Sequence, residues 1–120
     1  MKLNHLDIPV ADPAAVRTFF EDHFGLTCVF ARADGLIVLI DELGFALTLS
    51  PLPEGEILSY PTGFHVGFNL DDEISVRSQH DRLRHAGVPI VRPLGLLGGA
   101  WTFQCHAPGG IVVEIAWRQN

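Results

Sequence analysis

The sequence contains few basic residues and no basic run. Its 8 Lys and Arg residues against 14 Asp and Glu residues give a formal net charge of −6. A nucleic-acid-binding protein normally carries a basic patch, and an anionic membrane surface would repel an acidic chain. The longest apolar runs, such as residues 35–40, fall far short of the roughly 20 residues that a membrane span needs. The N-terminus also lacks the charged-then-apolar organisation of a signal peptide. We therefore expect a cytoplasmic protein that binds neither nucleic acid nor membranes.

Cysteine is also scarce, since only Cys28 and Cys105 are present and they form no CxxC motif. Two distant cysteines in a cytoplasmic chain are usually reduced and buried. We expect two such thiols and no structural disulfide.

The chain does contain an internal repeat. It has 120 residues, the usual size of one domain, and 48% of them are apolar. Residues 4–8 (NHLDI) and 64–68 (FHVGF) both alternate in polarity and carry a histidine at the same phase. An acidic break and a helical stretch that stops at Gly25 or Gly87 follow each segment, and short strand-like runs come next. This pattern predicts one α+β domain (residues 1–120) of two βαβββ modules, residues 1–50 and 63–118, joined by a linker at 51–62.

Each module contains one amphipathic helix. In the first, Asp12 can cap the helix, Pro13 suits its first turn, and Gly25 suits a left-handed end. Its apolar residues fall on one face: Val16, Phe19, Phe20 and Phe24. The second helix is expected at about residues 73–86. Its thinner apolar stripe is Val76, Leu83 and Ala86, and its solvent side is Arg77, Asp81, Arg82 and Arg84.

The strands have one apolar and one polar face, because successive side chains alternate. The apolar faces contain Leu6, Ile8 and Val10; Leu47 and Leu49; Val66 and Phe68; and Ile111, Val113 and Ile115. The opposite faces are small and polar, and they carry His5, His65 and Glu114. We expect the apolar faces to pack under the helices and the polar faces to contact a ligand.

Superposing the modules places His5 on His65 and Thr48 on Glu114. A duplicated fold brings equivalent strands together about a pseudo-twofold axis, so the two histidines and the glutamate are predicted to form a metal site. This ligand set suits a divalent metal such as Fe, Mn, Zn or Ni, whose identity stays open, and leaves coordination positions for a substrate.

Three stretches of this sequence carry a resemblance to the vicinal oxygen chelate superfamily, which includes glyoxalase I, extradiol dioxygenases, fosfomycin-resistance proteins and bleomycin-binding proteins. They are LNHLDIPVADPAAVRTFFEDHFGL, FHVGFNL and FQCHAPGGIVVEI. In the third, Phe103, Pro108, Gly110 and Glu114 fall in register with the family ending, while Ala107 replaces its usual aspartate. The resemblance covers essentially the whole chain. It implies two βαβββ modules that form a cupped mixed sheet with helices on the outer face.

The resemblance also implies that metal-using members place their ligands at His5, His65 and Glu114. Glyoxalase I usually has a fourth, carboxylate ligand at the position of Thr48, so three ligands are more similar to extradiol dioxygenases and fosfomycin-resistance enzymes. Fosfomycin enzymes hold a phosphonate with cationic groups. Because the acidic chain shows no obvious Lys/Arg cluster near the sheet face, this branch ranks low. Bleomycin-binding members lack the metal ligands.

The function that follows is a metal-dependent enzyme, a lyase, isomerase or extradiol-type dioxygenase, that chelates a small substrate with vicinal oxygens. The alternative is a bleomycin-resistance-like protein that binds a small molecule without turnover. A fosfomycin-type thiol transferase is the third option. No catalytic base stands out. We expect a homodimer, with the metal site either within one chain or shared between swapped chains.

Five further residues are candidates for substrate binding. Thr48 and Asn69 face the expected cavity, and His106 lies at a strand end. Trp101 and Phe103 are candidates for lining the cleft, although aromatic residues in strands more often belong to the core. The helical histidines His23, His80 and His85 are expected to be exposed to solvent.

Overall fold

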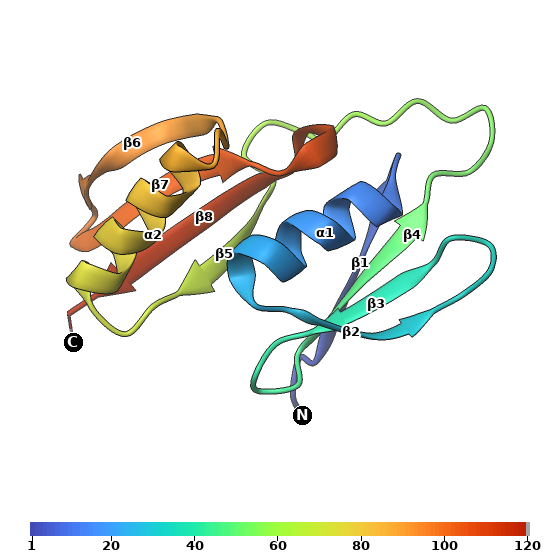
Figure 1. Ribbon diagram of the computed structural model, residues 1–120, viewed down its shortest axis with the longest axis horizontal. Helices are drawn as coiled ribbons and strands as arrows, with labels where there is room; N and C mark the ends of the chain where they lie inside the picture. Colours follow the sequence, from blue (N-terminus) through green and yellow to red (C-terminus); the bar gives the residue numbers. More distant parts are fainter. Residues whose placement is uncertain (120) are drawn as a thin grey trace. The chain divides into compact units, whose positions relative to one another are not determined.

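The chain folds into two compact units of the same architecture. The structure is a computed structural model that describes residues 1–119. Unit 1 is Met1–Ser59 and unit 2 is Tyr60–Asn120, so the boundary lies inside the linker expected from the sequence. Each unit contains a four-stranded mixed sheet and one α-helix (Figure 1). This is the predicted pair of βαβββ modules.

In unit 1, the first strand pairs with the last one. The elements are β1 (His5–Val10), α1 (Pro13–Phe24), β2 (Thr27–Ala31), β3 (Ile37–Ile40) and β4 (Ala46–Pro51). The sheet order is β1-β4-β3-β2, with β1 parallel to β4 and the other neighbours antiparallel. Strand β4 therefore includes Pro51, the first residue of the expected linker.

Unit 2 repeats this topology. Its elements are β5 (His65–Asn69), α2 (Glu73–His85), β6 (Ile90–Leu97), β7 (Ala100–His106), the short 3₁₀ turn η1 (Pro108–Gly110) and β8 (Val112–Arg118). The sheet order is β5-β8-β7-β6, with β5 parallel to β8. Strand β6 is irregular, because its register against β7 shifts on both sides of Arg92.

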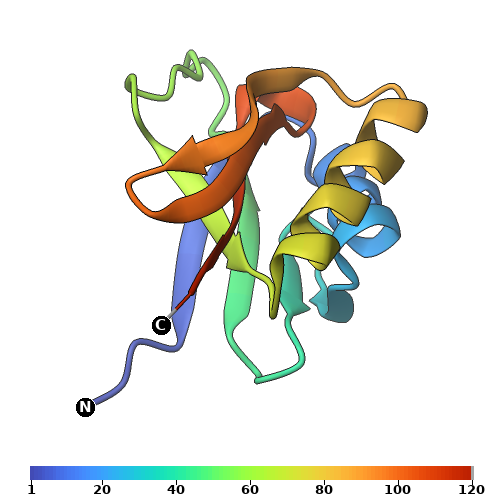
Figure 2. The same ribbon diagram turned by 90° about the vertical axis from the view of Figure 1, so that its left-hand side faces the viewer.

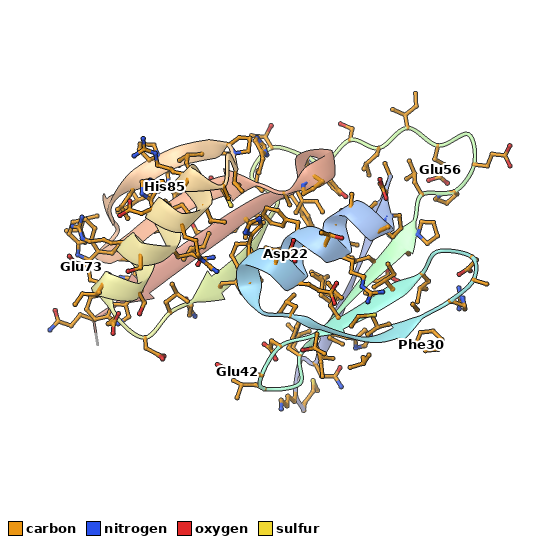
Figure 3. The ribbon with its side chains drawn as sticks, viewed as in Figure 1. Asp22, Phe30, Glu42, Glu56, Glu73 and His85 are labelled. Atoms are coloured by element: carbon orange, nitrogen blue, oxygen red, sulfur yellow. The ribbon has the colours of Figure 1, made fainter. Side chains whose placement is uncertain are left out.

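Local signals start both helices, and those of α1 are the ones that the sequence predicts. The Asp12 side chain accepts a hydrogen bond from the Ala15 N–H, Pro13 occupies the first turn, and Gly25 ends α1 with a φ of 66°. The Asp72 side chain caps α2 through the Ser75 N–H at 2.7 Å. Figure 3 labels Glu73 and His85 at the two ends of this helix.

Each helix covers one face of its own sheet (Figures 1 and 2). The buried side chains of unit 1 include Ile8, Val10, Val16, Phe20, Leu39 and Leu49. Those of unit 2 include Val76, Leu83, Phe103, Ile111, Val113 and Ile115. The predicted apolar faces are thus largely buried, but Leu6 is 40% exposed, and Val66 and Phe68 are only half-buried. Within residues 1–119, no helix is long and apolar enough to cross a membrane.

Candidate metal and substrate site

Strand pairing places two of the predicted ligands on the same face of unit 2. In the parallel pair β5–β8, His65 lies opposite Val112 and Gly67 lies opposite Glu114. Paired residues point to the same side of a sheet, so His65 and Glu114 share the face that α2 leaves uncovered. The His65 Nε2 atom lies 3.5 Å from Glu114 Oε2.

The ring of His65 is held by its other nitrogen. Its Nδ1 atom lies 2.8 Å from the carbonyl oxygen of Gly63. A carbonyl only accepts, so Nδ1 carries the proton and the lone pair of a neutral ring is on Nε2. That lone pair and a carboxylate oxygen repel each other unless a cation, either a proton or a metal ion, lies between them. The pair therefore has the donor chemistry of a metal site.

The second oxygen of Glu114 is bound by an arginine. Arg92 Nη2 donates to Glu114 Oε1 at 2.7 Å and to Thr102 Oγ1 at 3.1 Å. The side chains of Arg92 and Glu114 are 32% and 28% exposed, so this ion pair is partly shielded from water. The guanidinium fixes one carboxylate oxygen and leaves the other directed at His65.

A cavity of about 270 Å³ opens beside this ion pair. Its lining residues are Asn69, Arg92, Leu97, Ala100, Thr102, Glu114, Ala116 and Arg118. The cavity therefore contains two arginines. The expectation that no cationic cluster lies near the sheet face is wrong. The sequence does not predict the position of Arg92, because the irregular register of β6 breaks the alternation that assigns each residue to a face of the sheet. Arg118 could have been predicted, because it lies four residues after Glu114 in β8 and so shares its face of the sheet.

The predicted substrate-binding residues of unit 2 fall on different faces. Asn69 lines the cavity. His106 lies opposite Val112 and so shares the face of His65, but it does not line the cavity. Trp101 and Phe103 contact α2 instead: Arg77 stacks on the Trp101 ring at 4.4 Å, and His80 meets Phe103 edge-on. Both aromatic rings therefore lie on the helix-covered side.

Two expectations about side-chain exposure are wrong. The His80 side chain is only 12% exposed, because it packs against Phe103 rather than projecting into solvent. Arg77 stacks on Trp101, yet 47% of its side chain stays exposed, as expected. Both cysteines are free, as expected, but only Cys105 is buried, whereas Cys28 is partly exposed. Burial raises the pKa of the Cys105 thiol to about 11, which keeps it protonated and unreactive near neutral pH.

The corresponding face of unit 1 contains the other predicted residues. His5 lies opposite Ala46, and Asp7 lies opposite Thr48, so Thr48 has the register position that Glu114 has in unit 2. Asn4 Oδ1 lies 2.7 Å from His5 Nδ1. Because an amide oxygen only accepts, Nδ1 carries the proton and Nε2 keeps its lone pair, as in His65. Nearby, the Ser50 hydroxyl donates to Asp7 at 2.6 Å.

The spacing of these residues can be compared with the spacing of ligand atoms around a metal ion. Two ligand atoms about 2.1 Å from a tetrahedral metal lie about 3.4 Å apart, which matches the separation between His65 Nε2 and Glu114 Oε2. The residues of unit 2 thus fit two ligands of the expected set. Among residues 1–119, no group of three or more His, Cys, Asp and Glu side chains comes together as a complete metal site.

Comparisons with known proteins place this architecture in a family. The model of the Glyoxalase/Bleomycin resistance protein/Dioxygenase superfamily matches residues 2–115. The structure of a possible glyoxalase from Bacillus cereus is 39% identical, with a TM-score of 0.84, and the match covers 96% of this chain and 97% of that one. No curated protein matches the sequence.

More distant structures share the fold. Lactoylglutathione lyase from Agrobacterium tumefaciens is 19% identical, with a TM-score of 0.80 and coverage of 97% of this chain and 92% of that one. The fosfomycin resistance protein FosX from Listeria monocytogenes is 16% identical, with a TM-score of 0.80 and coverage of 98% and 91%. Because the family model spans nearly the whole sequence, this chain belongs to the Glyoxalase/Bleomycin resistance protein/Dioxygenase superfamily.

Proposed function

We propose that the protein is a metal-dependent enzyme that acts on a small substrate with two adjacent oxygen atoms. The proposal depends on one observation above all: His65 Nε2 and Glu114 Oε2 face each other at 3.5 Å while the Nδ1 proton of His65 is held by Gly63. His5 supports it, because its Nδ1 atom is likewise bonded, which leaves the lone pair on its Nε2 atom. His5, His65 and Glu114 are the proposed ligands.

Each residue of the proposed site has a separate task. A divalent metal held by His5, His65 and Glu114 would supply Lewis-acid polarisation of the substrate. The backbone of Gly63 and the side chain of Asn4 orient the two imidazoles. Arg92 holds one oxygen of Glu114, so that the carboxylate offers its other oxygen as a ligand. Asn69, in the cavity wall, is placed to bind a polar group of the substrate.

The reaction class is either lyase/isomerase chemistry or extradiol-type oxygenation. The names of the similar structures, a possible glyoxalase and a lactoylglutathione lyase, favour the first class. Thr48, at the register position of Glu114, offers a hydroxyl where glyoxalase I would need a carboxylate ligand, which favours a relative of glyoxalase I with a different substrate. Isomerase assays on thiohemiacetals and oxygen-uptake assays on catechols separate the two classes.

Elemental analysis of protein purified anaerobically without chelator tests the proposed metal. We expect roughly one divalent metal ion per chain. The variants His5→Ala, His65→Ala and Glu114→Gln should each lose it, because two remaining ligands hold a metal far more weakly than three. Glu114→Gln keeps the size of the side chain, so metal loss in this variant reports the missing charge.

His85→Ala serves as the matched control. His85 lies at the end of α2 (Figure 3), and its Nδ1 atom is bonded to the Asp81 carbonyl. This variant should keep its metal. Wild-type protein without metal, or full metal content in His65→Ala, would contradict the proposal.

A second candidate function is binding of a small molecule without turnover. The Arg92–Glu114 ion pair favours it, because a guanidinium already compensates the charge of the carboxylate that a metal would otherwise neutralise. In that case purified protein contains no metal, and His65→Ala does not change ligand affinity. The fosfomycin-type transferase remains the third candidate, now with two arginines in the cavity.

The oligomeric state and cellular location also remain predictions. We propose a homodimer in the cytoplasm. Mass measurement in solution tests the dimer, and a monomer with intact metal binding would exclude a site shared between chains.

A further inference from the structure

The charges in the cavity of unit 2 do not balance. Two of its lining side chains are cationic, Arg92 and Arg118, and one is anionic, Glu114. Arg92 is committed to Glu114 at 2.7 Å. Within residues 1–119, no carboxylate pairs with Arg118. Among the described side chains of the cavity, one positive charge therefore remains, in a protein whose formal net charge is −6.

Arg118 is held in place by the hairpin between β6 and β7. Its Nη1 atom donates to the carbonyl oxygen of Gly98. Gly98 and Gly99 both have positive φ, as a tight two-residue hairpin turn requires. A Cβ atom on Gly99 would lie 3.0 Å from Arg118 Nη1, so glycine leaves room for the guanidinium. The remaining N–H groups of Arg118 stay available, since a guanidinium has five donors.

The rest of the lining indicates the size and polarity of a ligand. Asn69 and Thr102 provide neutral polar groups, whereas Leu97, Ala100 and Ala116 form apolar wall. A volume of about 270 Å³ suits a small metabolite better than a drug-sized ligand. A single uncompensated charge matches a monoanion, and the fork of arginine donors matches the planar carboxylate group.

We propose that this cavity binds a small monocarboxylic acid through Arg118. The acid group pairs with the Arg118 guanidinium, and its short apolar part lies against Leu97 and Ala100. The assignment rests on the proposed function, since it places the acid beside Glu114 and so names the substrate class of that site as small carboxylic acids. Arg92 takes no direct part, because its task is to hold Glu114.

Titration of the metal-free protein tests this assignment. The protein is treated with chelator and titrated with mandelate, or with the uncharged analogue mandelamide, while amide shifts are followed by NMR. We expect saturable mandelate binding that shifts amides around the cavity, and binding of mandelamide that is about tenfold weaker or more. Because no metal is present, failure of the proposed metal chemistry leaves this result unaffected.

Arg118→Gln and Arg84→Gln remove the same charge, so comparing them shows whether Arg118 is responsible for mandelate binding. Arg118→Gln should weaken mandelate binding about tenfold or more, and Arg118→Lys should restore part of it. Arg84→Gln, on α2, should bind like the wild type. Equal binding of mandelate and mandelamide, or undiminished binding by Arg118→Gln, would overturn the proposal. Tighter binding of inorganic phosphate than of mandelate would overturn the choice of a carboxylate.

Discussion

Glu114 has a different partner on each of its two carboxylate oxygens. Arg92 donates to Oε1, and Oε2 faces His65. Of these residues, His65 and Glu114 could be found from the sequence, because they lie in regular strands at equivalent phases of the repeat. Arg92 could not, because β6 shifts register on both sides of it. A period-two pattern gives no reliable face in such a strand.

Replacing Arg92 tests whether it supports Glu114. Arg92→Ala removes the hydrogen bond that orients the carboxylate, and loss of such an outer partner typically weakens metal binding about 10-fold to 100-fold. We expect a loss in this range, measured by competition with a metal chelator of known affinity. Arg77→Ala, at the exposed Arg77–Glu73 pair, is the control. Tighter metal binding in Arg92→Ala would show instead that the guanidinium competes with the metal.

The sequence alone does not show whether the aromatic residues of β7 belong to the core or to the cleft. Trp101 and Phe103 were candidates for the cleft and also for the core, and composition could not separate these roles. Strand register separates them. Phe103 lies opposite the buried Ile115, and Trp101 opposite Trp117, so both share the face that packs under α2. The face of each aromatic residue thus depends on its partner in the neighbouring strand, which is distant in sequence.

At the scale of elements, the helices were the most predictable parts. Asp12, Pro13 and Gly25 act within a few residues of the ends of α1, so the sequence contains nearly all the information needed. The end of α2 was less sharply defined. The helix ends at His85, Ala86 is its cap, and Gly87 follows with a φ of 80°.

The cap of α2 makes stability depend on pH. Hydrogen bonds from the side chain and backbone of Ser75 hold the pKa of the Asp72 carboxyl below its usual value. A lowered pKa in the folded state means that stabilisation is present above the unfolded pKa of about 3.9 and is lost as pH falls through the folded value. Asp72→Ala should therefore be less stable than the wild type at about pH 7, with a smaller gap at about pH 3.

Thermal unfolding at both pH values measures this effect. Asp72→Asn keeps a capping group that does not titrate, so its difference from Asp72→Ala should change little with pH. A gap between wild type and Asp72→Ala that is the same at both pH values would rule out the charged cap as the cause.

At the scale of the whole molecule, the repeat is visible in strand pairing. The sheet orders β1-β4-β3-β2 and β5-β8-β7-β6 are equivalent element by element. The superposition of Thr48 on Glu114, made from the sequence alone, agrees with their equivalent positions opposite Asp7 and Gly67. Patterns within a strand are local, so they were predictable. Whether one chain or two supply the three proposed ligands depends on how the units pack, and no pattern in the sequence encodes this packing.

Mixing two variants that each lack one proposed ligand distinguishes a site within one chain from a site shared between two chains. If His5 of one chain completes a site with His65 and Glu114 of another, then His5→Ala and Glu114→Gln chains together form one intact site per mixed dimer. After joint unfolding and refolding, we expect about a quarter of all sites to recover metal. Each variant refolded alone is the control. No recovery, despite mixed dimers seen by mass spectrometry, would mean that all three ligands come from one chain.

The parallel pairing of β5 with β8 also has a consequence for folding. His65 and Glu114 lie almost at opposite ends of unit 2 in sequence, and they become neighbours only when the final strand of the unit joins the first. Contacts between residues about fifty positions apart form slowly, because a long loop must close before they yield any stabilisation. On the ribosome, therefore, the nascent chain cannot bring His65 and Glu114 together until strand β8 has been synthesised.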